Sequence, residues 1–416
     1  MEKATLKKII LEQQARIPGI KVRERDYVIE ANANYIFTGQ RRAGKTYFLY
    51  GIIQQMLSEG HVMEEIIYIN FEDERLLELT LADLDAVLVS YKELFTHQPI
   101  LFFDEIQNIR GWQKFARRMA DSDFRIFITG SNSEMLSGEM ATTLGGRFFI
   151  QEIDTLSFSE FLRFNDCVLT SNYEHSEERF EVFRLFEQYF IGGGFPELLK
   201  FTDKKDYLNT LFQKVFLGDI IARNQIRNTF ALQLLVKKLA ESTMDEVAYT
   251  RIRNIISSTG IKVGTSTVIE YVKYLQDAFL ISNLGNYASK ITERESKRKY
   301  YFRDNGLLAL FLIEPESFLL ENLVYNTLKR KYKDKLYYIR NDYEVDFYIP
   351  GEKLIQVSYQ LNNDVTRKRE LNALVKAAQS YQVSDLLLIT YQQEEQLYIA
   401  DKEIQILPAW KWILRL

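Results

Sequence analysis

A short segment near the N-terminus, Gly39-Gln-Arg-Arg-Ala-Gly-Lys-Thr46, matches the pattern G-x-x-x-x-G-K-[ST] and constrains the fold of this chain strongly. The run "YIF" before it predicts a buried strand, and "TYFLYGIIQQML" after it places apolar residues at helical spacing. Strand, glycine-rich turn and helix form the setting in which backbone N–H groups and a helix N-terminus bind phosphate. The alternative is a basic surface turn that caps a helix.

The phosphate-binding interpretation assigns a role to each polar group of this segment. Lys45 would reach the β- and γ-phosphate oxygens, and the Thr46 hydroxyl would be a ligand of Mg²⁺. The residues expected to contact the nucleotide are Gly39, Gln40, Arg41, Arg42, Ala43, Gly44, Lys45, Thr46 and Tyr47.

A second motif, "ILFFDEIQNI", is an apolar run that ends in Asp104-Glu105. A buried parallel strand delivers carboxylates at its C-terminal end in this way. Asp104 would hold Mg²⁺ through water, and Glu105 would polarise the attacking water. Taken alone, two such acids also suit the N-cap and first turn of a helix.

A third apolar run, "RIFITGSNSEML", ends in the polar residues Thr129, Ser131 and Asn132. One of them, Ser131 in preference, would sense the γ-phosphate or orient the water, although these residue types also simply make turns. Arg147 in "LGGRFF" would stabilise γ-phosphate charge within its own subunit or across a subunit boundary, or be a solvated surface arginine.

Two more apolar runs, "EIIYINFE" and "FFIQEI", bring the total to about five strands separated by helical stretches. This pattern predicts an α/β fold: the doubly wound parallel sheet of a P-loop NTPase, with its site at the strand C-termini. The chain of 416 residues is too long for one ordinary core, so two to three domains are expected.

Composition excludes several classes. The net charge of −4 arises from 53 basic and 57 acidic residues, so no overall field attracts nucleic acid, and any such binding needs a local patch. One cysteine, Cys167, excludes an internal disulfide and a cysteine-rich zinc site. The sequence shows neither a signal peptide nor an apolar run of membrane-spanning length, so a cytoplasmic protein is expected.

Taken together, "GQRRAGKT", "FFDEIQNIRGWQKFARRMAD", "ITGSNSEMLS", "LGGRF" and "LSFSEFL" resemble bacterial and archaeal ATP-binding proteins of the AAA superfamily, related to the archaeal-type ATPases. The resemblance covers nearly the whole chain. It implies ATP hydrolysis with Mg²⁺, with the roles of Lys45, Thr46, Asp104 and Glu105 as above, and it favours a role for Arg147. It also implies a C-terminal domain of unknown function whose last part is similar to restriction endonucleases.

We therefore expect four parts: a P-loop ATPase domain at 1–155, a helical linker or lid at 156–231, a winged helix at 232–312 and a nuclease-like domain at 313–416. Within the linker, Gly192 to Gly194 in "IGGGFPELL" would be a hinge or a plain turn.

The segment "TRIRNIISSTGIKVGTSTVIEYVKYLQDAFLI" predicts two helices joined by a short turn, the second starting at Ser266 or Thr267. In a DNA-binding winged helix this second helix would face a groove and a basic wing would contact phosphates, although many winged helices bind only protein. The groove residues would be Thr265, Ser266, Thr267, Glu270 and Lys273, and the phosphate contacts Lys297, Arg298, Lys299 and Arg303.

The last part resembles a metal-dependent nuclease with an altered site. Asp346 fits the aspartate that binds Mg²⁺, and Glu321 fits a helix glutamate seen in related folds. Where active relatives carry Glu-x-Lys, this chain has Gln356 and Ser358, which supply neither a carboxylate nor a positive charge. The pattern favours a retained fold used for contact over cleavage. Arg367, Lys368 and Arg369 would add backbone contacts or form a solvated helix face.

The leading hypothesis is thus a Mg²⁺-dependent ATPase whose nucleotide cycle repositions the C-terminal parts on DNA, with a homo-oligomer as a further option and no membrane partner. The alternatives are a nucleotide-dependent signalling switch that acts through protein contacts, and a metal-dependent DNA nuclease.

Overall fold

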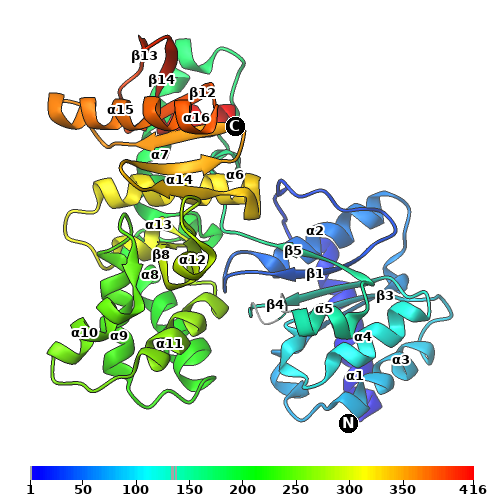
Figure 1. Ribbon diagram of the computed structural model, residues 1–416. Coiled ribbons are helices and arrows are strands. Elements are labelled where there is room, and N and C mark those ends of the chain that lie inside the picture. The colour runs from blue at the N-terminus through cyan, green and yellow to red at the C-terminus, as the bar shows by residue number, and fades with distance from the viewer. Residues whose placement is uncertain (1, 133–134, 136–137) are drawn as a thin grey trace. The chain divides into compact units, whose positions relative to one another are not determined.

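The computed structural model describes residues 2–132, 135 and 138–416 of the chain. It divides the chain into two compact units, Met1–Thr155 and Leu156–Leu416 (Figure 1). The finer division of residues 156–416 into linker, winged helix and nuclease-like domain remains a prediction, because these residues form one unit.

The first unit is built on a five-stranded sheet in the order β2-β3-β4-β1-β5, and every neighbouring pair of strands is parallel. The strands are β1 Asn34–Thr38, β2 Ile66–Asn70, β3 Ile100–Asp104, β4 Ile126–Gly130 and β5 Phe148–Glu152. The apolar runs form strands because a parallel sheet is covered on both faces. The expected α/β class and parallel P-loop sheet are confirmed.

Helices cover both faces of this sheet. Neighbouring residues of a strand point to opposite faces, so Phe102 packs with Phe37 and with α2, whereas Phe103 packs with Ile69 and with α1, α3 and α4. The helices are α1 Lys3–Arg16, α2 Lys45–Ser58, α3 Leu84–Lys92, α4 Trp112–Asp121 and α5 Gly138–Leu144. The two apolar layers hold the strand ends in register, and those ends carry the polar motifs.

The second unit begins with helices. They are α6 Phe158–Phe164, α7 Glu178–Gly192, α8 Lys204–Lys214, a π-helix at Val215–Ala222 and α9 Thr229–Ala240. The turn after α7 is clamped: the Asp304 carboxylate accepts from the N–H groups of Gly194 and Gly306, both at 2.8 Å. A Cβ at Gly193 would lie 1.8 Å from Asp304. These contacts favour the plain turn over the hinge.

A small antiparallel sheet follows, in the order β6-β8-β7. Its elements along the chain are β6 Val247–Ala248, α10 Tyr249–Ser258, α11 Thr265–Asp277, β7 Ile281–Leu284, α12 Ile291–Ser296 and β8 Lys297–Phe302. Two helices between the first and second strands of a three-stranded sheet are compatible with the predicted winged helix, which stays a prediction. The second helix begins at Thr265, one residue before the expected start.

The chain ends in a six-stranded mixed sheet, in the order β13-β14-β12-β11-β10-β9 (Figure 1). Its strands are β9 Tyr337–Arg340, β10 Glu344–Ile349, β11 Lys353–Val357, β12 Asp385–Thr390, β13 Glu395–Ile399 and β14 Lys402–Pro408. The accompanying helices are α13 Asn305–Ala309, α14 Glu316–Tyr332, α15 Asp364–Tyr381 and α16 Ala409–Arg415. The antiparallel pair β10 and β11 is joined by the expected Pro-Gly turn, in which Gly351 has φ 73°.

Within the described part of the chain, no helix combines the length and the apolar character that crossing a bilayer requires.

Candidate functional site

The loop between β1 and α2 is shaped by its glycines. Gly39 has φ 142° and Gly44 has φ 100°, values that side chains rarely adopt. Lys45 is the first residue of α2, and no side-chain cap at Gly44 was found among the described residues. The N–H groups of the first helical turn are therefore available to an anion.

We expect Gly39→Ala to disrupt the loop. A Cβ at Gly39 would lie 2.2 Å from the carbonyl oxygen of Ile153, whose own N–H donates to the Thr38 carbonyl at 2.7 Å. The clash is with backbone, so the loop must move, at a cost of about 1–3 kcal/mol. Urea unfolding and binding of a fluorescent ATP analogue measure the two effects. Gly60→Ala is the matched control, because Gly60 also has positive φ, 104°, but no atom within 4 Å of its Cβ position. Equal losses in both variants would contradict the steric explanation.

Lys45 is buried at the loop. Its ammonium donates to the carbonyl oxygens of Gly39 at 3.0 Å and Gln40 at 3.1 Å, and it lies 3.8 Å from Glu105. The predicted phosphate-binding lysine and the predicted catalytic glutamate are thus neighbours. Of the other loop residues, Arg41 pairs with Glu72, Arg42 and Tyr47 are exposed, and Ala43 is buried.

Asp104 lies at the C-terminal end of β3 and is fully buried. Its carboxylate accepts from Thr46 Oγ1 at 2.8 Å, from Tyr68 OH at 2.7 Å and from Thr129 Oγ1. Burial, followed by the charge of Glu105, raises the pKa of Asp104 above its usual value, against the effect of these hydrogen bonds. Thr46 and Asp104, the two residues predicted to hold Mg²⁺, are therefore in direct contact.

Glu105 follows with left-handed backbone, φ 54°, and its N–H donates to Thr129 Oγ1 at 2.9 Å. The left-handed conformation turns the chain sharply at the end of β3. Burial raises the pKa of Glu105, but the charge of Lys45 and the hydrogen bond from Gln107 outweigh it, so the pKa is lowered overall. The Glu105 carboxylate is thus held in its ionised form.

Gln107 is a member of this site that the sequence did not reveal. Its amide nitrogen donates to Glu105 and, at 3.3 Å, to the hydroxyl of Ser131. Its amide oxygen is buried and has no hydrogen-bond partner among the described groups. The only indication in the sequence that Gln107 belongs to the site is its position two residues after Glu105. A glutamine at that position is equally suited to a turn. Ser131 is therefore linked to Glu105 through this side chain, and its role as a sensor stays a prediction.

Arg147 lies elsewhere. It precedes β5, whose first residue Phe148 pairs with Asn34 at the start of β1, while the phosphate loop follows the end of β1. The two are separated by the length of β1, about 13 Å. Arg147 is exposed, and its Nε donates to Asp121 at 2.7 Å. The expected contact within its own site is not supported, because parallel strands put these two ends at opposite edges of the sheet; a role across a subunit boundary remains a proposal.

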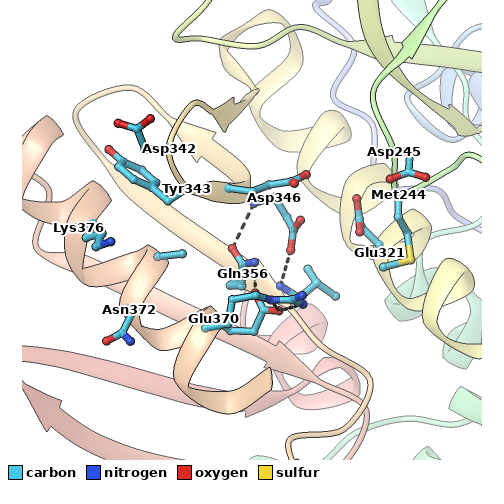
Figure 2. A pocket seen from close by; sticks show the side chains of 14 residues that line it. Met244, Asp245, Glu321, Asp342, Tyr343, Asp346, Gln356, Glu370, Asn372 and Lys376 are labelled. Carbon is cyan, nitrogen blue, oxygen red and sulfur yellow. Dashed lines mark hydrogen bonds and ion pairs between the residues drawn. The ribbon is translucent and has the colours of Figure 1, made fainter. Parts of the chain in front are cut away.

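The second unit brings together most of the predicted nuclease-like residues. Glu321 on α14, Asp346 on β10 and Gln356 on β11 line one cavity of about 570 Å³ (Figure 2). Gln356 Oε1 accepts from the Asp346 N–H at 3.3 Å, and its amide nitrogen donates to Glu370. Ser358 is not among the cavity residues; its hydroxyl donates to the Gln360 carbonyl at 3.0 Å.

The predicted basic wing is only partly exposed. Lys297 is exposed, but Arg298 donates to Asn283, and Arg303 lies over the ring of Phe279. Lys299 is fully buried, so its expected contact with a phosphate is wrong. On α11, Ser266, Glu270 and Lys273 are exposed as a groove-facing helix requires, whereas Thr265 and Thr267 are half-buried.

The basic run on α15 is also partly paired. Arg367 binds Glu395 at 2.6 Å and Arg369 binds Glu370 at 2.5 Å, while Lys368 is exposed. This pairing favours a solvated helix face over a set of phosphate contacts.

The parallel strand order, the phosphate-binding loop and the buried Asp104-Glu105 pair define an ATP-binding P-loop NTPase of the AAA type. A family model described as an AAA domain matches residues 31–162, and one described as a domain of unknown function matches residues 183–317. An uncharacterized protein of Methanocaldococcus jannaschii is 36% identical over 99% of this chain and 96% of its own length. The chain belongs to the family of that protein.

Other similar proteins are more distant. An uncharacterized protein of Haemophilus influenzae is 31% identical over 65% of this chain and 67% of its own length. Among solved structures, a Walker-type ATPase of Pyrococcus abyssi matches with a TM-score of 0.41 and 14% identity, covering 74% of this chain and 95% of that chain. The ORC1 protein of Aeropyrum pernix in complex with DNA matches with a TM-score of 0.33 and 14% identity, covering 77% and 92%.

Proposed function

We propose that this chain is a Mg²⁺-dependent ATPase whose nucleotide state controls DNA binding by its second unit. One observation carries the enzymatic part: Lys45, Thr46, Asp104 and Glu105 meet at the C-terminal edge of one parallel sheet, and each is held by contacts of 2.7–3.8 Å. A basic surface turn would need none of these partners.

The residues present fit ATP and Mg²⁺. Two buried oxygens at this edge, Thr38 Oγ1 and Gln107 Oε1, have no partner among the described groups, as expected where a polar ligand completes the site. Thr46 and Asp104 would hold Mg²⁺, and Lys45 and the loop N–H groups would bind the phosphates. A bound ion would supply positive charge that stabilises the phosphates.

Hydrolysis needs a group that accepts a proton from water. Glu105 is ionised and lies beside Lys45, so its carboxylate is placed to orient the attacking water and accept its proton. Gln107 fixes that carboxylate and links it to Ser131, which is placed to report the presence of the γ-phosphate. In this proposal Gln107 and Ser131 are positioning residues.

The direct test is Lys45→Ala. The variant removes the buried ammonium that donates to the Gly39 and Gln40 carbonyls of the loop, so we expect ATP turnover, measured as phosphate release, to fall by about 10²-fold or more. Lys92→Ala, at an exposed lysine of α3, is the matched control and should leave turnover unchanged. Measuring turnover with and without DNA, and the mass of the protein with and without nucleotide, tests partner and assembly in the same series. Unchanged turnover in Lys45→Ala would reject the assignment.

The DNA part of the proposal is supported by the exposed residues Ser266 and Lys273 of α11 and by Lys297. A second function, a nucleotide-dependent switch that acts on a protein, is favoured by two observations on the predicted winged helix. Lys299 is withdrawn from the wing, and Ile269 on α11 is 44% exposed. The slope of log affinity for duplex DNA against log salt separates the two functions: a steep negative slope supports DNA contact, and absent binding or a slope near zero supports the switch.

A further inference from the structure

A lysine is buried completely in the second unit. Lys299 on β8 has a relative exposure of 0%, although it lies in the basic run "KRKYYF". An ammonium withdrawn from water is costly unless opposite charges surround it. The contacts of Lys299 must therefore account for its position.

Three carboxylates from two other elements surround this ammonium. Nζ lies 3.3 Å from Glu321 of α14, 3.0 Å from Glu344 of β10 and 3.4 Å from Asp346 of β10. Two of these three acids, Glu321 and Asp346, are the residues expected to bind a divalent ion in a nuclease-like site. The protein places its own cation among them.

The other oxygens of this cluster are also engaged. Asp346 Oδ2 accepts from the Val357 N–H at 2.9 Å, and Glu321 accepts from Tyr301 OH at 2.8 Å. The Gln356 side chain bonds to Glu370 and to the Asp346 N–H, as Figure 2 shows. Oxygens of Asp346 and of Glu321 thus already have hydrogen-bond donors within the protein.

The residues present do not fit a divalent ion. Within residues 2–132, 135 and 138–416, no group of three or more His, Cys, Asp or Glu side chains is arranged to hold one. The cavity beside the cluster is acidic, since two bases, Arg369 and Lys376, stand against a larger set of acids. Those acids are Asp245, Glu321, Asp342, Glu344, Asp346 and Glu370. Without a metal, such a cavity repels a phosphodiester.

We propose that Lys299 is the resident cation of the C-terminal sheet: its ammonium takes the charge-neutralising place of the divalent ion in a nuclease-like site, so this domain works without metal and does not cut DNA. The same contacts join β8 of the small sheet to α14 and β10 of the large one. The two sheets then move as one body, and a nucleotide-driven change would reposition both together.

The proposal is tested on the full chain by Mn²⁺ binding, measured by electron paramagnetic resonance without nucleotide, and by urea unfolding. The chain has 3 tryptophans, and Trp112→Phe removes the one in the first unit. The fluorescence of the remaining two, Trp410 and Trp412, then reports on the second unit. The ATP site is the same in every chain compared, so its contribution cancels. Lys297→Met, an exposed position on the same strand, is the matched control for Lys299→Met.

We expect the unchanged chain and Asp346→Asn to bind the same amount of Mn²⁺. The urea midpoint of the unchanged chain should be the same in Mn²⁺ as in EDTA. Lys299→Met should lower the midpoint and Lys297→Met should not. Mn²⁺ should then raise the midpoint of Lys299→Met, but not that of Lys299→Met with Asp346→Asn.

Two results would overturn the proposal. The first is that the unchanged chain binds a Mn²⁺ ion that Asp346→Asn does not bind. The second is that Mn²⁺ does not change the urea midpoint of Lys299→Met. Should Lys299→Met fail to fold, the comparison of the unchanged chain with Asp346→Asn decides by itself. The outcome is independent of ATP hydrolysis.

Discussion

Glu105→Gln should lower ATP turnover by about 10²- to 10⁴-fold while ATP still binds. An amide keeps the size of the side chain and can still hydrogen-bond Gln107, but it cannot accept the proton of the attacking water. The variant also loses the negative charge that faces Lys45 at 3.8 Å, so ATP affinity should be kept or rise. Single-turnover phosphate release gives the chemical step, and titration with a fluorescent ATP analogue gives the affinity.

Glu59→Gln is the matched control, because Glu59 is exposed at the end of α2, where it accepts a hydrogen bond from Gln55 at 2.8 Å. Its turnover should equal that of the unchanged chain. A fall in ATP affinity as large as the fall in turnover would assign Glu105 to nucleotide binding instead of the chemical step.

The sequence predicted the first unit well because its signals are local. The loop Gly39–Thr46 and the pair Asp104-Glu105 each lie at the end of a continuous apolar run, and parallel strands bring such ends to one edge. Five strands and the site edge follow from these runs alone.

Contacts between distant segments were not predictable in this way. Gln107 donates a hydrogen bond to Ser131, 24 residues further along, and both α4 and β4 lie between them in the chain. Arg147 follows two glycines and is a candidate to stabilise γ-phosphate charge, but the register of β5 against β1 places it at the opposite edge of the sheet. The few residues around Gln107 do not predict its hydrogen bond to Ser131. The few residues around Arg147 do not predict at which edge of the sheet it lies.

Lys299 shows the same limit most clearly. Its neighbours Lys297 and Arg298 are basic, so the run predicts a surface wing. Its partners Glu321 and Asp346 lie 22 and 47 residues later in the chain, on other elements. Only the packing of β8 against α14 and β10 places Lys299, but not Lys297, in the interior.

The buried acids of the first and second units thus differ in the partners that surround them. In the first unit, Asp104 and Glu105 have partners that a nucleotide and Mg²⁺ would extend, and two buried oxygens beside them have no hydrogen-bond partner within the part of the chain that the structure describes. In the second unit, Asp346 and Glu321 line a cavity but are already held by Lys299, Tyr301 and the Val357 N–H. This contrast supports our two proposals, ATP hydrolysis in the first unit and a second unit that works without metal.

The stability of the second unit should fall as pH rises from about 5 to about 8, and Glu321→Gln should flatten this dependence. Burial, with Asp346 adding to it and Lys299 opposing it, raises the pKa of Glu321 from 4.5 to about 8. Over that window the unfolded chain has released the Glu321 proton and the folded chain still holds it, so each rise in pH favours unfolding. The limiting slope is about 1.4 kcal/mol per pH unit for one proton, and the change over the window is about 3 kcal/mol.

Glutamine resembles the protonated acid and cannot titrate, so only the smaller contribution of Asp346, whose pKa burial raises to about 6, remains in the variant. Urea unfolding followed through Trp410 and Trp412 in the Trp112→Phe background, from pH 5 to pH 9, gives both curves. Glu316→Gln, at the exposed start of α14, should keep the slope of the unchanged chain. A slope that is the same in Glu321→Gln, or stability that rises toward pH 8 in the unchanged chain, would show that Glu321 is already ionised when it is buried beside Lys299.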